Sequence, residues 1–225
     1  MRFGFMEDFR NPTKWRKPFP EFYNAILDQI VRGEELGYDN ITMGESWAED
    51  AFTSLAQISA VTNKIRIGTS IVPVYARTPA NLAMTALNMD VMSNGRFFLG
   101  LGSSGKLVIE DFHGEEFRKP LSRMREYITF LRKASRGETL DHEGQFFNTK
   151  RFKIRFPAYR ENLPIYIASL TPASLKMTGE LADGWLPIYC LLYTSDAADD
   201  TTCVDLGGRR IIKKKWGGGG GGGGG

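Results

Sequence analysis

Short apolar stretches alternate along this chain with longer segments in which apolar residues recur every three or four positions. The first pattern is typical of buried strands and the second of amphipathic helices. The stretches expected to form strands are residues 2–6, 41–43, 65–74, 96–102, 164–170 and 184–188. The segments expected to form helices are residues 21–36, 52–61, 78–92, one beginning near 121 and one beginning at 171. This alternation predicts an α/β fold with a parallel sheet.

Local signals support several of these boundaries. Gly37 follows the helix expected over residues 21–36 and suits the left-handed residue that ends many helices. Thr78-Pro79 has the residue types favoured at an N-cap and a first helical turn. Residues 138–155 depart from the alternation, and we expect an inserted β-hairpin there with its turn near Glu143-Gly144.

Two architectures fit a strand–helix repeat of this kind, namely an open doubly wound sheet and an eight-stranded (β/α)8 TIM barrel. Periodicity alone does not distinguish them. A full barrel takes about 250 residues. If the fold is a barrel, six strands and five helices are expected here, and two strands and three helices are missing.

The last segment, residues 190–225, differs in character from the rest of the chain. Back-translated in one frame, residues 190–195 match the mosaic end of transposase-based sequencing libraries, and residues 204–212 match a flow-cell adapter. Residues 217–225 are all glycine, as poly-G base calls would give. A natural origin is the alternative, because basic clusters can bind nucleic acid and glycine runs can be linkers. We expect a truncated domain over residues 1–189 followed by translated adapter sequence.

Composition narrows the class of protein once this tail is left out. Leaving out its five basic and four acidic residues lowers the net charge from +3 to +2, which indicates no polyanionic partner. Both cysteines, Cys190 and Cys203, lie in the tail, and the two histidines, His113 and His142, are far apart, so we expect no disulfide and no metal site. No apolar run has the length of a membrane span, and the first residues turn acidic too soon for a signal peptide. The sequence therefore predicts a cytoplasmic enzyme without a nucleic-acid or membrane partner.

The glycine-rich segment at residues 100–107 (GLGSSGKL) is the most prominent motif. It has the spacing of a dinucleotide-binding loop and nearly that of a P-loop. A P-loop needs Ser or Thr after Lys106, where this chain has Leu107. A dinucleotide-binding loop leads directly into a helix, whereas we expect a long loop before the helix near residue 121. The remaining interpretations are a tight turn, or close approach of the backbone to a planar, phosphorylated cofactor at a strand end.

Other candidate residues follow the ends of neighbouring strands. Thr171-Pro172 begins a helix directly after a strand, where free amides can bind an anion, although an ordinary helix cap is the alternative. In a barrel, Ser169 and Thr171 would share a rim with Ser103 and Ser104.

Three further candidates have strong structural alternatives. Glu45 could orient a substrate or cofactor from the end of the second strand, or be a solvated charge. His113 could donate a proton near neutral pH, although a lone loop histidine is more often structural. The first loop could receive an anionic substrate or simply be solvated; its residues are Arg10, Lys14, Trp15, Arg16 and Lys17.

Taken together, these stretches resemble the luciferase-like monooxygenase superfamily, and most closely its branch of oxidoreductases that use flavin or the deazaflavin coenzyme F420. The stretches that carry the resemblance are residues 45–53, 67–80, 95–105, 112–114, 119–126, 165–168 and 180–187. They cover nearly all of residues 1–189, in the order and at the spacing of the family.

The resemblance implies a (β/α)8 barrel that holds an isoalloxazine-like ring at its carboxyl-terminal mouth. It also implies a non-proline cis peptide at Ser70–Ile71, pressed against the ring. The implied cofactor contacts map onto Gly68, Thr69, Ser70 and Ile71 after the third strand, Gly102, Ser103 and Ser104 after the fourth, and Ala168, Ser169, Leu170 and Thr171 after the fifth.

The chain departs from the sugar-phosphate dehydrogenases of the same superfamily at two positions. Those relatives have an aspartate–histidine pair where this chain has Glu45-Ser46. They also have a glutamate just after the strand glycines, where this chain has Gly105-Lys106. The resemblance therefore implies cofactor chemistry without sugar-phosphate dehydrogenation.

We expect an oxidoreductase that transfers hydride between coenzyme F420 or FMN and a small organic substrate, with monooxygenation as a further outcome if the cofactor is FMN. No catalytic side chain is assigned beyond the weak candidate Glu45. One alternative is a metal-free barrel lyase or isomerase that acts on a phosphorylated substrate, and another is an inactive fragment. We also expect the full-length protein to be a homodimer.

Overall fold

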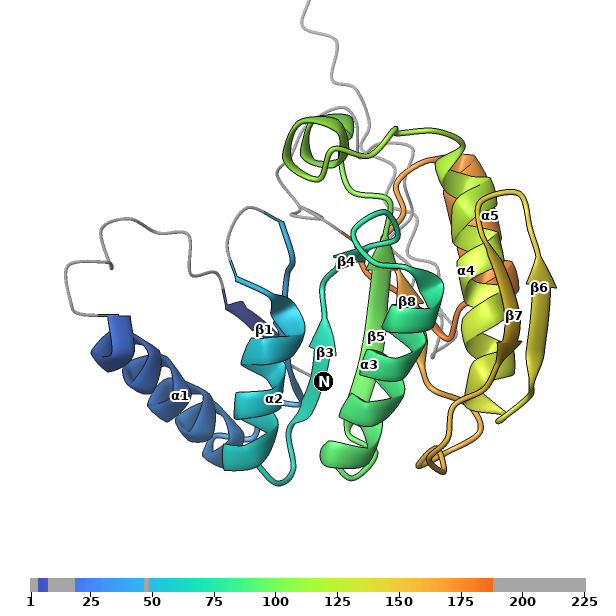
Figure 1. Ribbon diagram of the computed structural model, residues 1–225. Helices are drawn as coiled ribbons and strands as arrows, with labels where there is room; N and C mark the ends of the chain where they lie inside the picture. The colour runs from blue at the N-terminus through green and yellow to red at the C-terminus, as the bar shows by residue number, and fades with distance from the viewer. Residues whose placement is uncertain (1–3, 8–18, 47–48, 188–225) are drawn as a thin grey trace, which may run out of the picture.

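A computed structural model describes residues 4–7, 19–46 and 49–187 (Figure 1). The basic residues of the first loop and the tail at residues 190–225 lie outside the described residues, so the predictions made for them remain predictions. The described residues form an α/β fold in which the helices pack along a parallel sheet.

Six parallel strands lie side by side in the described part of the sheet, as the strand pattern predicts. Its order is β1 (Gly4–Glu7), β2 (Asn40–Met43), β3 (Arg66–Thr69), β5 (Phe97–Gly102), β8 (Ile165–Ile167) and β9 (Gly184–Trp185). A two-residue strand, β4 (Val72–Pro73), continues the path of β3 and pairs with β5. Within the described residues, β1 and β9 are the two edges and the sheet does not close. The fold is thus a partial barrel.

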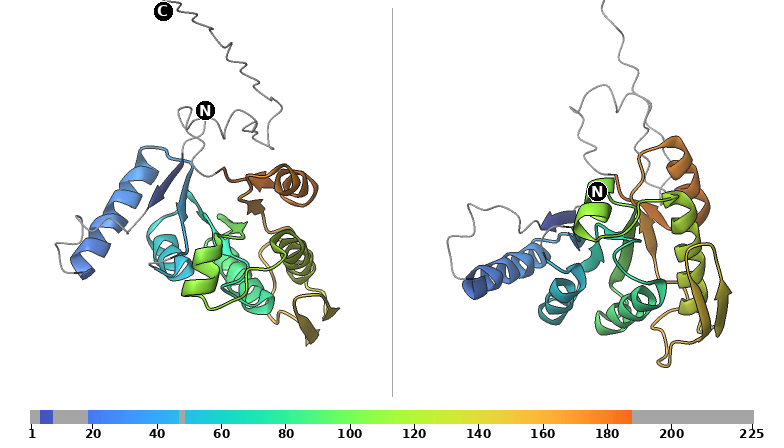
Figure 2. Two further views of the ribbon diagram at one scale, coloured as in Figure 1. Left: turned by 90° about the horizontal axis from the view of Figure 1, so that it is seen from above. Right: turned by 45° about the horizontal axis from the view of Figure 1, so that its top comes forward.

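In the described part of the chain, the α-helices follow the outer side of the curved sheet, as the view from above shows (Figure 2). They are α1 (Phe19–Glu35), α2 (Ala51–Val61), α3 (Pro79–Met92), α4 (Pro120–Ser135) and α5 (Pro172–Leu181). The expected caps are present: Gly37 has φ 84°, and the Thr78 side chain accepts a hydrogen bond from the Asn81 amide. The expected hairpin is also confirmed, as β6 (Leu140–Glu143) and β7 (Asn148–Phe152).

The two faces of the sheet have different side chains because residues alternate along each strand. Those beneath the helices are aliphatic or aromatic and almost completely buried; they include Ile41, Ile67, Phe97, Leu99, Leu101, Ile165 and Ile167. On the concave face, the Phe98 and Tyr166 rings lie 4.9 Å apart, and the Arg66 guanidinium lies 5.0 Å from the Phe98 ring centre. This cluster lies towards the amino-terminal ends of the strands and leaves their carboxyl-terminal ends for a site.

Two arginines fix the turns at the amino-terminal ends of the strands. The Arg96 guanidinium donates to the Thr62 hydroxyl and to four backbone carbonyls, those of Ser59, Thr62, Ile65 and Ser93. Arg160 donates two hydrogen bonds, of 3.0 and 2.6 Å, to the carboxylate of Asp90, whose side chain is fully buried in α3. These contacts tie the loops to the sheet far from the strand ends that bear the predicted site.

Candidate functional site

The strand predicted over residues 65–74 is interrupted where the site was expected. The β3–β5 register pairs Gly68 with Phe98, whereas the β4–β5 register pairs Val72 with Leu101. Four steps along one strand therefore face three along its neighbour, which is the pattern of a β-bulge. The bulge contains Ser70 and Ile71, and the peptide bond between them is cis, as the resemblance implies.

Glycines on the neighbouring strands let the bulge approach closely. A Cβ atom at Gly100 would lie 1.9 Å from the Thr69 carbonyl oxygen, and one at Gly102 would lie 2.8 Å from the Ile71 side chain. A Cβ at Gly44 would lie 3.1 Å from the Ser70 carbonyl oxygen. Gly100 and Gly102 therefore permit close packing of the strands, a role that neither interpretation of the 100–107 motif includes.

The segment after β5 differs from the long loop that the sequence suggested. Ser103 and Ser104 follow Gly102 directly, with Ser104 in the left-handed region at φ 56°. A short π-helix, η1 (Val108–Phe112), then lies at the carboxyl-terminal end of the sheet (Figure 1). The long loop expected before residue 121 therefore contains a short helix that the sequence did not predict. Both serines are partly exposed, so their side chains are accessible from the rim.

Some residues after β8 are accessible to a ligand, whereas the polar groups of others form hydrogen bonds within the protein. Ala168 is partly exposed and Leu170 is exposed. Ser169 is buried, and its hydroxyl forms a 2.8 Å hydrogen bond with the Thr178 hydroxyl of α5. Thr171 forms a capping box with Ser174, in which the amide of Thr171 donates to the Ser174 hydroxyl at 3.0 Å. The first turn of α5 therefore offers fewer free amides to an anion than its sequence suggested.

Glu45 is mostly buried and held in an ion pair, so it is not the solvated charge that the sequence offered as an alternative. Its carboxylate accepts hydrogen bonds from Arg77 at 3.3 and 3.0 Å, and its side chain is only 10% exposed. Arg77 also pairs with Asp50, and its guanidinium lies 4.9 Å from the centre of the Phe52 ring. Burial opposes the charge on Arg77, but the two carboxylates outweigh it and raise the pKa of this guanidinium. The cluster joins the loops that follow β2 and β4.

His113 follows η1 and gains no support as a proton donor. Its ring meets Phe112 edge-on, with the ring centres 5.0 Å apart. Its Nε2 atom is buried without a hydrogen-bond partner among the residues that the structure describes.

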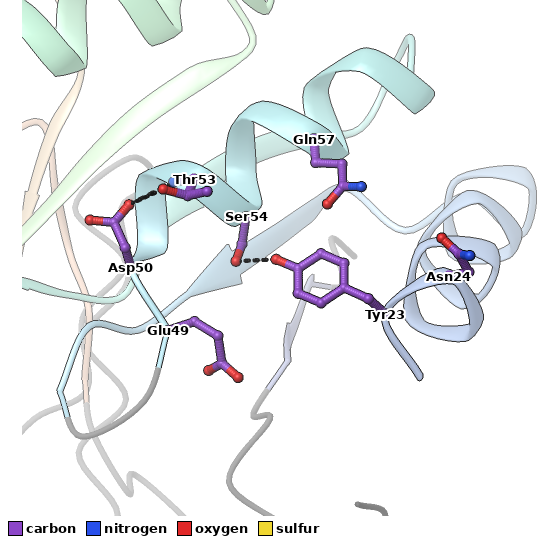
Figure 3. A pocket seen from close by; sticks show the side chains of 7 residues that line it. All are labelled: Tyr23, Asn24, Glu49, Asp50, Thr53, Ser54 and Gln57. Carbon is purple, nitrogen blue, oxygen red and sulfur yellow. Dashed lines mark hydrogen bonds between the residues drawn. The ribbon is translucent and has the colours of Figure 1, made fainter. Parts of the chain in front are cut away.

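A pocket of about 500 Å³ lies apart from these strand ends, between α1 and α2 (Figure 3). It is lined by Tyr23, Asn24, Glu49, Asp50, Thr53, Ser54 and Gln57. The Tyr23 hydroxyl hydrogen-bonds to that of Ser54 across it. Because it contains none of the predicted cofactor residues, this pocket is separate from the predicted site.

The predicted residues instead gather along one edge of the sheet. Ser70, Ser103 and Ala168 follow β3, β5 and β8, which are parallel neighbours, so all three lie at the carboxyl-terminal edge. Hydrogen bonds link the strand ends here: the Glu45 amide donates to the Ile71 carbonyl at 3.0 Å, and the Ala168 amide to the Leu101 carbonyl at 2.9 Å. We call this edge the rim. It consists of Ser70 and Ile71 after β3, Ser103 and Ser104 after β5, and residues 168–170 after β8. No side chain of the predicted cofactor set is charged, so a flat ring could pack against the rim without displacing an ion pair.

The sequence profile described as luciferase-like monooxygenase matches residues 1–199. The chain belongs to the luciferase-like monooxygenase family. It is 37% identical over 172 residues to a Mycobacterium tuberculosis protein named as a coenzyme F420-dependent oxidoreductase, covering 71% of this chain and 50% of that protein. It is 30% identical over 175 residues to the F420-dependent glucose-6-phosphate dehydrogenase of Rhodococcus erythropolis, covering 72% and 52%.

Solved structures of luciferase-like enzymes have the same fold. The oxygenating constituent of 3,6-diketocamphane monooxygenase from Pseudomonas putida, in complex with FMN, superposes with a TM-score of 0.72 at 18% identity, covering 84% of this chain and 57% of that one. The likeness shows the fold, a luciferase-like TIM barrel of which this chain forms part. The chain spans about half the length of the curated relatives it matches.

Proposed function

We propose that the complete protein is an oxidoreductase that transfers hydride between coenzyme F420, or FMN, and a small organic substrate. The observation that carries the proposal is the rim, where three neighbouring parallel strands end in small, uncharged residues beside a bulge. The names of the two relatives favour F420, and they support an oxidoreductase rather than the lyase or isomerase alternative.

Residues at and beneath the rim would have two different roles in binding such a cofactor. The accessible ones, Ser70, Ile71, Ser103, Ser104 and Leu170, would pack against the ring or donate hydrogen bonds to it. The buried predicted residues Gly68, Thr69, Gly102 and Ser169 would support them from below. When bound, the cofactor supplies the hydride chemistry, and FMN could in addition activate oxygen.

The proposed limit on the substrate class follows from the ion pair of Glu45 and from the residue that follows it. The Glu45 carboxylate is bound to Arg77, and no histidine follows it where sugar-phosphate dehydrogenases of the family have their aspartate–histidine pair. A group held in a buried ion pair is poorly placed to accept a proton from a sugar hydroxyl. We therefore propose that the substrate is not a sugar phosphate.

The test is a titration of the product of the complete reading frame with each cofactor. We expect saturable binding of F420 or FMN at one site per chain, measured as quenching of the cofactor's fluorescence. Binding of neither cofactor by the folded protein would refute the proposed function. Turnover of glucose 6-phosphate would refute the proposed exclusion of sugar phosphates.

We also propose that the complete protein acts in the cytoplasm as a homodimer that pairs through α2 and α3. Neither helix presents a charged side chain to solvent, in contrast to α1 and α4. The exposed residues of this uncharged face are Thr53, Gln57, Ala60, Val61, Asn81, Met84, Asn88, Val91 and Met92. A face without charge suits a second copy of itself, because no like charges meet across a two-fold axis.

In the part of the chain that the structure describes, no helix meets the length and apolarity needed to cross a membrane.

A charge placed in the uncharged face should separate the subunits. Met84 is 53% exposed in the middle of α3, so Met84→Glu would place two like charges close together at such an interface. We expect light scattering to give a dimer mass for the unmodified protein and a monomer mass for this variant. Leu36→Glu, at an apolar position just after α1 that is 63% exposed, should remain dimeric. A dimer with Met84→Glu would contradict this interface.

A further inference from the structure

The hydrogen-bond ladder between β3, β4 and β5 is incomplete at the bulge. Below the bulge, the Ile67 amide donates to the Arg96 carbonyl at 3.2 Å, and above it the Val74 amide donates to the Gly102 carbonyl at 3.0 Å. Gly100 lies between these two bonds on β5. Because the register with β5 shifts between β3 and β4, the backbone groups of Gly100 need another partner.

A side chain takes the place of the missing backbone partner. The Thr69 hydroxyl donates to the Gly100 carbonyl at 2.7 Å and accepts from the Gly100 amide at 2.8 Å. Thr69 has no exposed surface, so solvent does not supply these bonds. A hydroxyl has one donor and two acceptor positions, which suits it to satisfy an amide and a carbonyl of the same residue.

The other side of the bulge is held by backbone atoms alone. The Ser70 amide donates to the Met43 carbonyl at 2.7 Å, and the Glu45 amide donates to the Ile71 carbonyl at 3.0 Å. These bonds do not involve the side chain of residue 69. Between the backbone bonds of Ile67 and Val74 to β5, the Thr69 hydroxyl therefore links the bulge to β5.

We propose that Thr69 is a positioning residue, whose hydroxyl sets the place of the Ser70–Ile71 bulge relative to Gly102 and Ser103 on the rim. It does so without touching the cofactor, because both of its hydrogen bonds lie inside the sheet. The proposal rests on the proposed function, since it treats the rim as the place where the ring binds. It gives Thr69 a different role from the direct cofactor contact that the resemblance implies.

The test compares three variants of the complete protein. Thr69→Val keeps the shape of the side chain but leaves a buried amide and carbonyl without partners. Thr69→Ser keeps the hydroxyl and removes only a methyl group. Thr129→Val is the matched control, because the Thr129 hydroxyl donates to the Arg125 carbonyl on the exposed side of α4.

We expect Thr69→Val to bind the cofactor about tenfold or more weakly, and to shift the visible absorption band of the bound ring. Thr69→Ser should bind within about threefold of the unmodified protein and keep its band, and Thr129→Val should match it in both. Thermal unfolding of the cofactor-free proteins serves as the second measurement.

Each other outcome decides against the proposal in a different way. Unchanged binding and an unchanged band in Thr69→Val would show that the hydroxyl does not set the rim. Equal losses in the Val and Ser variants would assign the effect to packing of the methyl group. A Thr69→Val protein that does not fold would show that the hydroxyl supports the whole sheet. If the unmodified protein binds neither cofactor, the proposed function fails first, and that result is seen before any variant is measured.

Discussion

Replacing Arg160 by methionine is expected to lower the free energy of unfolding by about 3 to 5 kcal/mol at neutral pH. The Asp90 carboxylate has no exposed surface, and Arg160 gives it two hydrogen bonds and its compensating charge. Without the guanidinium, a buried carboxylate would remain with no cation beside it. Chemical unfolding followed by circular dichroism measures the loss.

The dependence on pH distinguishes this mechanism from a simple loss of packing. Burial raises the pKa of Asp90 above its ordinary value, although Arg160 acts to lower it. A carboxyl group with a raised pKa favours the folded state below its unfolded pKa, and this contribution is lost as the pH rises through the folded pKa. Removing Arg160 should raise this pKa further. The difference in stability between the two proteins should therefore shrink as the pH falls from 7 towards 4.

An exposed ion pair provides the control. Arg136 donates to Glu138 at 2.8 Å, with both side chains more than 40% exposed. Because water screens such a pair, Arg136→Met should cost less than about 1 kcal/mol. Equal losses at Arg160 and Arg136, or a difference that does not change with pH, would contradict the role given to Asp90.

Local patterns in the sequence were sufficient for most of the fold. The spacing of apolar residues located the five helices, and Thr78-Pro79 and Gly37 marked boundaries that the structure has at the same residues. The hairpin within residues 138–155 was found because its pattern breaks the strand–helix repeat. These features depend on residues close in sequence, and short-range signals identify them well.

Most of the features that the sequence did not predict share a physical cause, which is contact between residues far apart in sequence. A continuous apolar run does not reveal that residues 65–74 contain a bulge, because the extra residue appears only in the register with β5. The ion pair between Glu45 and Arg77 joins positions 32 apart, and the bonds between Thr69 and Gly100 join positions 31 apart. The short helix η1 was missed for another reason: five residues are too few for a periodic pattern.

The predicted site depends in the same way on residues that the sequence could only suggest. Resemblance placed the cofactor contacts at three strand ends, and the structure brings these ends to one rim. What the structure adds is a division of the set, because Thr69 and Ser169 use their hydroxyls within the protein while Ser103 and Ser104 remain accessible.

Replacing Gly100 by alanine should damage both the sheet and the rim, more severely than any other single methyl group added to the glycine motif. The new Cβ would lie 1.9 Å from the Thr69 carbonyl oxygen and 2.7 Å from the Leu186 side chain. The first of these is a backbone atom that cannot rotate away, so β3 and β5 must separate and the bonds between Gly100 and Thr69 must break. We expect a loss of about 3 kcal/mol or more in unfolding free energy, and no measurable cofactor binding by the complete protein.

Gly179→Ala on α5 is the control, and it should raise the free energy of unfolding. An added Cβ there has no neighbour within 4 Å, and alanine favours the helix by about 1 kcal/mol. Gly100→Ala with unmodified stability would show that the two strands are not held as close together as this bulge requires.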